Sequence, residues 1–257
     1  MLLAKNIRVA TWNLDHAYNN SRPIPLQISR IREINPDIII LTETTAEVSL
    51  EDIGYQGAYP EHKNKYGKFC SAIWSKFPIE FVFPIEEKML AVAALIGTPL
   101  GPVVVYGTII PYHGYKGPNG ISPAWQEHYK SITRQAIDWA RILELTAHKI
   151  PLVVAGDFNQ TRDGSHRTYG TDQGRLQLSS VLKQNNMHCL TEENFALSGK
   201  LNTDPAKGKA RNNIDHICLY QCHLQPEYIG AWDHFTNDGV YLSDHNGVFV
   251  DLMLQNV

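Results

Sequence analysis

The chain has 257 residues, of which 43% are hydrophobic, so it can bury a large core without disulfides or a structural metal. Its 23 lysines and arginines against 26 aspartates and glutamates give a net charge of −3, which excludes a protein that binds polyanions through a basic surface alone. The four cysteines lack CxxC spacing and are too few for a disulfide scaffold, which fits a reducing compartment or simple core thiols.

No targeting or membrane segment is evident in the sequence. The apolar block at the amino terminus is too short for a signal peptide, and no run approaches the roughly 20 residues of a membrane span. We therefore expect a soluble, cytoplasmic protein without a membrane span, and the sequence indicates no protein partner.

Apolar runs interleaved with stretches of helical periodicity predict eight or more strands and three helices. The strands are expected at residues 7–12, 37–41, 69–74, 90–96, 102–110, 152–155, 214–220 and 247–254. The helices are expected at residues 24–34, 125–148 and 174–185. Because no linker divides the chain, we expect one mixed α and β domain over residues 1–257, with sheets packed face to face and helices outside.

Two segments have the composition of surface loops. Residues 111–123 are rich in glycine and proline. Residues 198–213 contain Lys200, Lys207, Lys209 and Arg211. These cations could follow a nucleic-acid backbone or could simply be solvated. Trp125, Trp232 and Tyr112 could likewise stack on bases or pack in the core.

Polar side chains stand at five places where the apolar pattern of a strand stops. The segments are Asn13-Leu14-Asp15, Thr42-Glu43, Gly156-Asp157-Phe158-Asn159, Asp215-His216 and Ser243-Asp244-His245. Because side chains alternate along an extended chain, Asp157 and Asn159 should point the same way, and His216 should point away from Asp215. Carboxylates and amides without thiolates suit Mg²⁺ or Mn²⁺. This donor set predicts hydrolytic attack on phosphorus.

The order of these motifs resembles the endonuclease/exonuclease/phosphatase superfamily, which includes nucleases, sphingomyelinases and inositol-polyphosphate phosphatases. The resemblance runs from residue 7 to residue 252 and depends on five short motifs in the family's order. It implies an α+β (α/β) fold, a four-layer αββα sandwich of two mixed β-sheets flanked by helices. It also implies a hydrolase of phosphoester bonds that uses Mg²⁺ or Mn²⁺ and whose substrate could be a nucleic acid.

The resemblance implies a metal site built around Glu43, with Asn13 and Asp244 beside it. Asp15 falls where some nucleases of the family place a second metal-site aspartate. Each of these four residues also has an ordinary structural interpretation. Asn13 and Glu43 could cap the strand ends, and Asp244 and Asp15 could be turn residues.

Four further residues match the family's catalytic positions. Asp157 matches the aspartate that orients or deprotonates the attacking water, and Asn159 matches the asparagine that binds the scissile phosphate. His245 matches the histidine that stabilises the transition state, and Asp215 matches the aspartate that fixes its tautomer. A capping aspartate and a satisfied core histidine are the structural alternatives.

Two positions depart from the family's pattern. Many members have a Tyr or His where this chain has Ile109, and the following Tyr112 and His113 could reach the same space as substrate-binding residues or be ordinary loop residues. No lysine follows Glu43, which argues against the abasic-site endonuclease branch. The alternative functions are a lipid or inositol phosphoesterase and a non-catalytic module that binds a phosphate ligand on the same scaffold.

Overall fold

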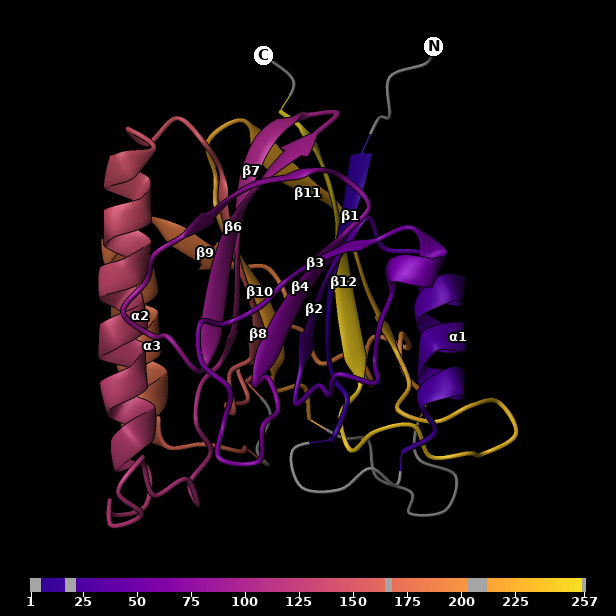
Figure 1. The fold of residues 1–257 in the computed structure, drawn as a ribbon, viewed down its shortest axis with the longest axis horizontal. Helices are drawn as coiled ribbons and strands as arrows, with labels where there is room; N and C mark the ends of the chain where they lie inside the picture. Colours follow the sequence, from indigo (N-terminus) through magenta and orange to yellow (C-terminus); the bar gives the residue numbers. More distant parts are fainter. Residues whose placement is uncertain (1–5, 17–21, 165–167, 203–211, 256–257) are drawn as a thin grey trace.

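The computed structural model describes residues 6–16, 22–164, 168–202 and 212–255 (Figure 1). These residues form two mixed sheets of six strands each and three α-helices. The first sheet contains β1 (Asn6–Asn13), β2 (Ile38–Thr42), β3 (Gln56–Ala58), β4 (Ser71–Ser75), β11 (Leu224–Trp232) and β12 (Gly247–Leu254). The second contains β5 (Ile79–Phe83), β6 (Ala91–Thr98), β7 (Gly101–Ile109), β8 (Leu152–Asp157), β9 (Met187–Cys189) and β10 (Asp215–Tyr220).

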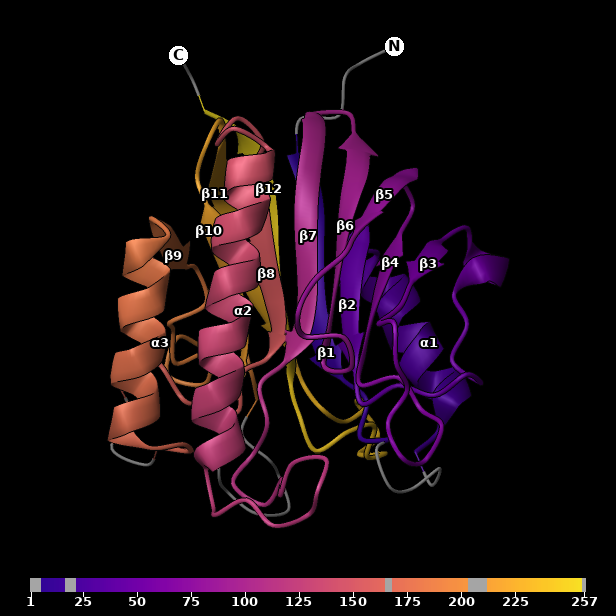
Figure 2. The ribbon, with the colours of Figure 1, turned by 60° about the vertical axis from the view of Figure 1, so that its left-hand side comes forward.

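Helices cover the outer faces of both sheets, so the molecule has four layers (Figures 1 and 2). Helix α1 (Ile24–Ile34) packs on the first sheet, where its Ile31 joins Trp12 and Trp74 in one buried cluster. Helices α2 (Gln126–Leu145) and α3 (Asp172–Gln184) pack on the second sheet. The predicted αββα sandwich is therefore confirmed. No described helix has the length and hydropathy needed to cross a membrane.

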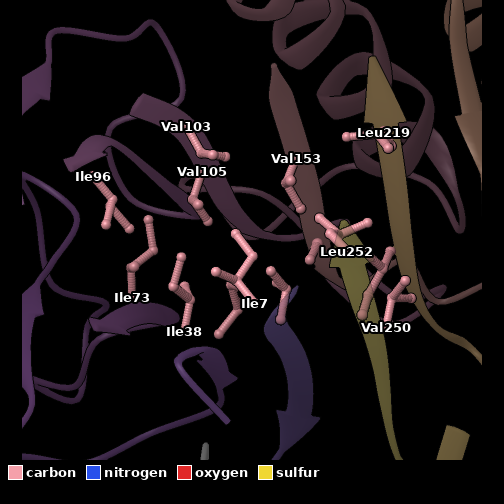
Figure 3. Close-up of a cluster of buried hydrophobic side chains, with 14 of the residues drawn as sticks. Ile7, Ile38, Ile73, Ile96, Val103, Val105, Val153, Leu219, Val250 and Leu252 are labelled. Carbon is pink, nitrogen blue, oxygen red and sulfur yellow. The ribbon is translucent and has the colours of Figure 1, made fainter. Parts of the chain in front are cut away.

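The main core lies between the two sheets (Figure 3). Strand β1 shows how alternation builds it, because Ile7 and Val9 point into this core while Ala10 and Trp12 point towards α1. Valines and isoleucines from both sheets fill the space, and most are completely buried. Such β-branched side chains suit a pleated surface that is covered on both faces.

The eight predicted strands and three predicted helices are all present; the helix at residues 24–34 and the strand at residues 247–254 have the predicted ends, and the other elements have shifted ends. The helix expected at residues 125–148 begins one residue later and ends at Leu145. Its boundaries are explained by the left-handed backbone of Trp125, Ala147 and His148, whose φ angles are 65°, 49° and 57°. The sequence did not predict β3, β5, β9 or β11, which are the four edge strands.

The strand order brings the predicted polar segments to one end of the sandwich. The first sheet runs β11-β12-β1-β2-β4-β3 and the second β5-β6-β7-β8-β10-β9. In each sheet the two central strands, β1 with β2 and β7 with β8, are parallel, and every other pairing is antiparallel. The ends of β1, β2 and β8 therefore lie with the starts of β10 and β12 at the same end of the sandwich.

Candidate active site

Asp157, Asp215 and His245 form the centre of the site. Asp157 ends β8 and Asp215 begins β10, and the antiparallel register places them directly opposite each other. The His245 Nδ1 lies 2.5 Å from the Asp215 Oδ2. One potential ligand atom from each of the three residues lies within 4.8 Å of the other two. Both aspartates are 1% exposed, so two acids and an imidazole share a small, nearly dry volume.

Two asparagines hold the Asp157 carboxylate in place. The Asn13 Nδ2 donates to its Oδ2 at 3.1 Å and the Asn159 Nδ2 to the same oxygen at 3.0 Å. The backbone N–H of Asn159 donates to Oδ1 at 2.8 Å. Phe158 points into the core under α2 and α3, as the alternation predicts. Three donors on one buried carboxylate fix its orientation, and the amide of Asn13 reaches it from the opposite sheet.

Glu43 follows β2 with a left-handed backbone, at a φ of 48°. Two hydrogen bonds hold this conformation, from the Glu43 N–H to the carbonyl of Cys70 at 2.9 Å and from the N–H of His16 to the Glu43 carbonyl at 3.0 Å. Burial raises the pKa of Glu43, while the charge of His245 and a hydrogen bond from Asn13 lower it in part. The Glu43 carboxylate therefore belongs to the same group of charges as Asp157 and His245.

The charges of this cluster shift one another's ionisation. The pKa of Asp157 is raised to about 8, chiefly by burial and also by the Asp215 and Glu43 carboxylates, against the lowering effect of His245. Burial disfavours the charged form of His245, but the Asp215 and Asp157 carboxylates outweigh it and hold its pKa well above the usual value. The site contains more acids than its single imidazole can neutralise, which is an environment that favours a bound cation.

Asp244 and Asp15 lie at the margin of this cluster. The Asp244 carboxylate is 3.6 Å from the His245 Nε2, and its side chain is 45% exposed. Asp15 has a left-handed backbone with a φ of 57°, and its carboxylate forms an ion pair with Arg22. Because Arg22 already neutralises Asp15, this carboxylate is the weakest of the predicted metal ligands.

Tyr112 and His113 lie in an aromatic group that also contains Trp125 and Tyr169. The His113 ring is 5.5 Å from Tyr112 and 5.8 Å from Trp125, and the Trp125 ring is 5.8 Å from Tyr169. The His113 Nδ1 is 3.4 Å from the Tyr169 hydroxyl. Of these four residues His113 is exposed and the other three are half-buried.

The backbone places this aromatic group beside Asn159. Asn159 Nδ2 donates to the carbonyl of Ile110 at 2.9 Å, two residues before Tyr112. The N–H of Thr161 donates to the carbonyl of Tyr169 at 3.0 Å, and the Tyr169 N–H donates back to the Thr161 hydroxyl at 2.9 Å. Burial raises the pKa of Tyr169 to about 12, and the Asp157 carboxylate contributes. Sequence reasoning missed Tyr169, because no motif surrounds it.

The other residues considered from the sequence lie elsewhere. Trp232 is 4% exposed and packs in the core of the first sheet. His216 points away from the site, where its Nε2 lies 2.9 Å from the carbonyl of Gln160. Lys200 pairs with Glu193 at 2.7 Å. Lys207, Lys209 and Arg211 lie outside the described residues.

The sequence matches the Endonuclease/Exonuclease/phosphatase family over residues 10–245, so the chain belongs to this family. The human Nocturnin catalytic domain with bound sulfate anion is similar, with a TM-score of 0.66 at 20% identity over 98% of this chain and 94% of that one. D. rerio TDP2 complexed with single strand DNA product has a TM-score of 0.69 at 13% identity, covering 97% and 99%.

A third similar structure is the endonuclease/exonuclease/phosphatase from Bacteroides vulgatus, with a TM-score of 0.68 at 15% identity over 98% of this chain and all of that one. These identities are low, so the likeness to solved structures establishes the shared fold. Comparison with the curated proteins gives no match.

Proposed function

We propose that this protein is a divalent-metal-dependent phosphoesterase whose chemistry depends on Asp157, Asn159, Asp215 and His245. The observation that carries the proposal is the contact of His245 with Asp215 directly beside Asp157, at the sheet edge where Glu43 and Asn13 also lie. Membership of the Endonuclease/Exonuclease/phosphatase family supports the same reaction class.

The donor set fits a hard divalent cation. The buried Asp215 Oδ1 has no hydrogen-bond partner among the described residues, and the raised pKa values of Glu43 and Asp157 reflect burial and repulsion by neighbouring carboxylates. Glu43, with Asn13 and the exposed Asp244, would hold the cation through oxygen atoms. When bound, it would offset the negative charge of the phosphate ester and of its transition state.

The protein side chains would divide the remaining tasks. The Asp157 carboxylate, oriented by Asn13 and Asn159, would align a water molecule for attack on phosphorus and accept its proton. Protonated His245 would donate a hydrogen bond from Nε2 to a phosphate oxygen, because its Nδ1 is held by Asp215. The Asn159 amide would bind the same phosphate by redirecting one of the two Nδ2 hydrogens that donate to Asp157 and to the carbonyl of Ile110.

The aromatic group beside Asn159 favours a nucleic-acid substrate over a lipid or an inositol phosphate. Tyr112, His113, Trp125 and Tyr169 offer ring surface next to the proposed phosphate position. Bases stack on aromatic side chains with little dependence on sequence. A panel of single-stranded DNA, abasic DNA, sphingomyelin and inositol phosphates, assayed with Mg²⁺ and with Mn²⁺, tests this preference, and turnover confined to the lipid or the inositol phosphates would contradict it.

Alanine substitution tests the mechanism. Asp157→Ala and His245→Ala should each lower hydrolysis of bis-p-nitrophenyl phosphate or DNA by about 100-fold or more, because each removes a fixed electrostatic partner of the transition state. Initial rates with Mg²⁺ measure the loss, and the melting temperature reports whether the fold survives.

Matched controls are available for both variants. Asp172→Ala removes a carboxylate that is 94% exposed on α3, and His62→Ala removes an imidazole that is 59% exposed. Both controls should keep wild-type rates. Near-normal turnover by Asp157→Ala and His245→Ala would rule out the mechanism. A wild-type protein without turnover on any ester and without stabilisation by metal would instead favour the non-catalytic binding module.

A further inference from the structure

A cluster of reactive side chains outside the candidate active site lies where β9 pairs with β10. Cys189 and Cys218 are directly opposite each other in this antiparallel pair. The next pair along is hydrogen bonded, because the N–H of Leu190 donates to the carbonyl of Ile217 at 2.8 Å. Since bonded and non-bonded pairs alternate in an antiparallel ladder, the two cysteines occupy a non-hydrogen-bonded pair.

This position has the geometry of a disulfide. Directly opposite residues of a non-hydrogen-bonded pair have Cα atoms about 4.5 Å apart, within the range of roughly 4.4–6.8 Å found for disulfides. Both side chains lie on the same face of the sheet, since Cys218 belongs to the core under α2 and α3 and Cys189 packs against it. Both are free thiols in this structure.

Polar and cationic groups surround Cys189. Its Sγ lies 3.9 Å from the hydroxyl of Thr191, which is 3.2 Å from the His216 Nδ1. The Arg162 side chain, only 9% exposed, forms an ion pair with Glu192, and its charge also contributes to lowering the pKa of Cys189. Burial disfavours the Cys189 thiolate, but a hydrogen bond with Cys218 and the charges of His216 and Arg162 outweigh burial, and the pKa of Cys189 falls well below the usual value.

Cys218 has the opposite character. It is completely buried, and burial together with the interaction with Cys189 raises its pKa well above the usual value. Cys189 is half-buried and lies on an edge strand. The pair therefore combines a half-buried thiol of lowered pKa with a fully buried thiol beside it.

We propose that Cys189 and Cys218 are a redox-active dithiol that closes to a disulfide when the protein meets a peroxide. The Cys189 thiolate attacks one peroxide oxygen, the O–O bond breaks, and the hydroxide that leaves takes up a proton to become water. The Cys218 sulfur then attacks the sulfur of the resulting sulfenic acid, the S–O bond breaks, and a second water leaves with the Cys218 proton. Two electrons pass from the two sulfurs to the peroxide.

The other two cysteines serve as internal references. Burial raises the pKa of Cys70 to about 12, so its thiol stays protonated. The Cys222 Sγ donates to the carbonyl of Lys149 at 3.3 Å. Neither of them faces a second cysteine across paired strands, whereas Cys189 and Cys218 do.

Oxidation of the full wild-type chain tests the proposal directly. The reduced protein is treated with a small excess of hydrogen peroxide, blocked with N-ethylmaleimide and mapped by peptide mass spectrometry. The expected result is one linked pair of peptides, which contain Cys189 and Cys218. Its mass should be about 2 Da below the sum of the two reduced peptides, and dithiothreitol should separate the pair. A sulfinic acid at Cys189 without any link, or links that involve Cys70 or Cys222, would overturn the proposal.

Thiol reactivity gives an independent test of which cysteine attacks. At neutral pH one thiol of the wild-type chain should react with iodoacetamide at least about tenfold faster than the rest, because the thiolate is the nucleophile. Cys189→Ser should abolish this fast phase and Cys222→Ser should retain it. Equal rates for all wild-type thiols would contradict the assignment of Cys189 as the attacking cysteine. The rate measurement on the wild-type chain, like the peptide map, does not depend on whether a variant folds.

Discussion

Asp215 determines how His245 presents its ring. The hydrogen bond from Nδ1 to Asp215 leaves Nε2 directed towards the exposed Asp244. The same carboxylate raises the pKa of His245, so the imidazolium persists at a higher pH than in a free histidine. In the proposed mechanism, Asp215 is therefore a positioning residue that acts through His245.

Asp215→Asn should lower kcat by about 100-fold to 10,000-fold, because the imidazolium loses its orienting carboxylate. The alkaline limb of the kcat/KM profile should also move to lower pH, since removing a nearby negative charge lowers the pKa of His245. Rates on bis-p-nitrophenyl phosphate across the pH range measure both effects. Asp172→Asn, at an exposed position, should change neither, and an unmoved alkaline limb in Asp215→Asn would separate Asp215 from His245.

His128 gives the stability of the protein a pH dependence. Its ring is completely buried, Nδ1 donates to the carbonyl of Pro111 at 2.7 Å, and Nε2 lies 2.6 Å from the Gln160 side-chain nitrogen. Burial lowers the pKa of His128 to about 4, from an unfolded value of 6.5. Between these two pH values the unfolded chain therefore binds a proton at His128 that the folded chain does not bind. The free energy of unfolding consequently falls as the pH drops from 6.5 to about 4.

At a pH near 4, the pKa of His128 in the folded protein, this difference in proton binding lowers the free energy of unfolding by about 3 kcal/mol. The free energy of unfolding, measured by urea denaturation, should decrease less between about pH 7 and about pH 5 in His128→Gln than in the wild type. His62→Gln, which alters an exposed histidine, should keep the wild-type slope. An equal slope in wild type and His128→Gln would show that His128 ionises in the folded protein.

At the scale of elements, the strands predicted from sequence are those inside the sheets. The four that were missed, β3, β5, β9 and β11, are the edges of the two sheets. They are short or partly exposed, and the register shifts within β5 and β11. Edge strands need few apolar residues and tolerate bulges and proline, so hydrophobic pattern alone does not reveal them.

The end of β8 depends on Gly156. This residue has a φ of 147°, and a Cβ built on it would lie 1.7 Å from the carbonyl oxygen of Thr108 on β7. Asp157 follows directly, so the close approach of the two strands helps to fix the position of the Asp157 carboxylate.

Gly156→Ala should lower the free energy of unfolding by more than about 2 kcal/mol, because the methyl group would have to displace a paired backbone. Urea denaturation measures the loss. Gly239→Ala is the control, since Gly239 also has a positive φ, 85°, but open space around it. It should cost only the strain of the left-handed backbone, about 1 kcal/mol. Equal losses in both variants would mean that β7 and β8 can separate without cost.

At the scale of the whole molecule, the site joins both halves of the sandwich. Asn13 and Glu43 come from the first sheet, Asp157 and Asp215 from the second, and His245 precedes the last strand of the first. The hydrogen bond from Asn13 to Asp157 crosses between the sheets. A cation held here would therefore stabilise the packing of one sheet on the other.

Metal binding should stabilise the folded chain. Mg²⁺ or Mn²⁺ at about 100 times its Kd should add about 2.7 kcal/mol to the free energy of unfolding, because the ion binds the native site and not the unfolded chain. A rise in Tm that EDTA reverses measures this effect. Glu43→Gln should lose most of the rise, while Glu47→Gln, at an exposed position four residues later, should keep it. A full rise in Glu43→Gln would place the ion elsewhere.

From the sequence alone, the inner strands, the helices, the family and the polar segments at the strand ends could be predicted, because alternation, helical periodicity and motif order are local properties of the chain. Which of those polar groups touch was decided by the tertiary structure. Strand register places Asp157 opposite Asp215 and Cys189 opposite Cys218. The Asp15 carboxylate forms an ion pair with Arg22. Tyr169 reaches the site through backbone pairing with Thr161. Such contacts join residues distant in sequence, so they arise only when the sheets are assembled.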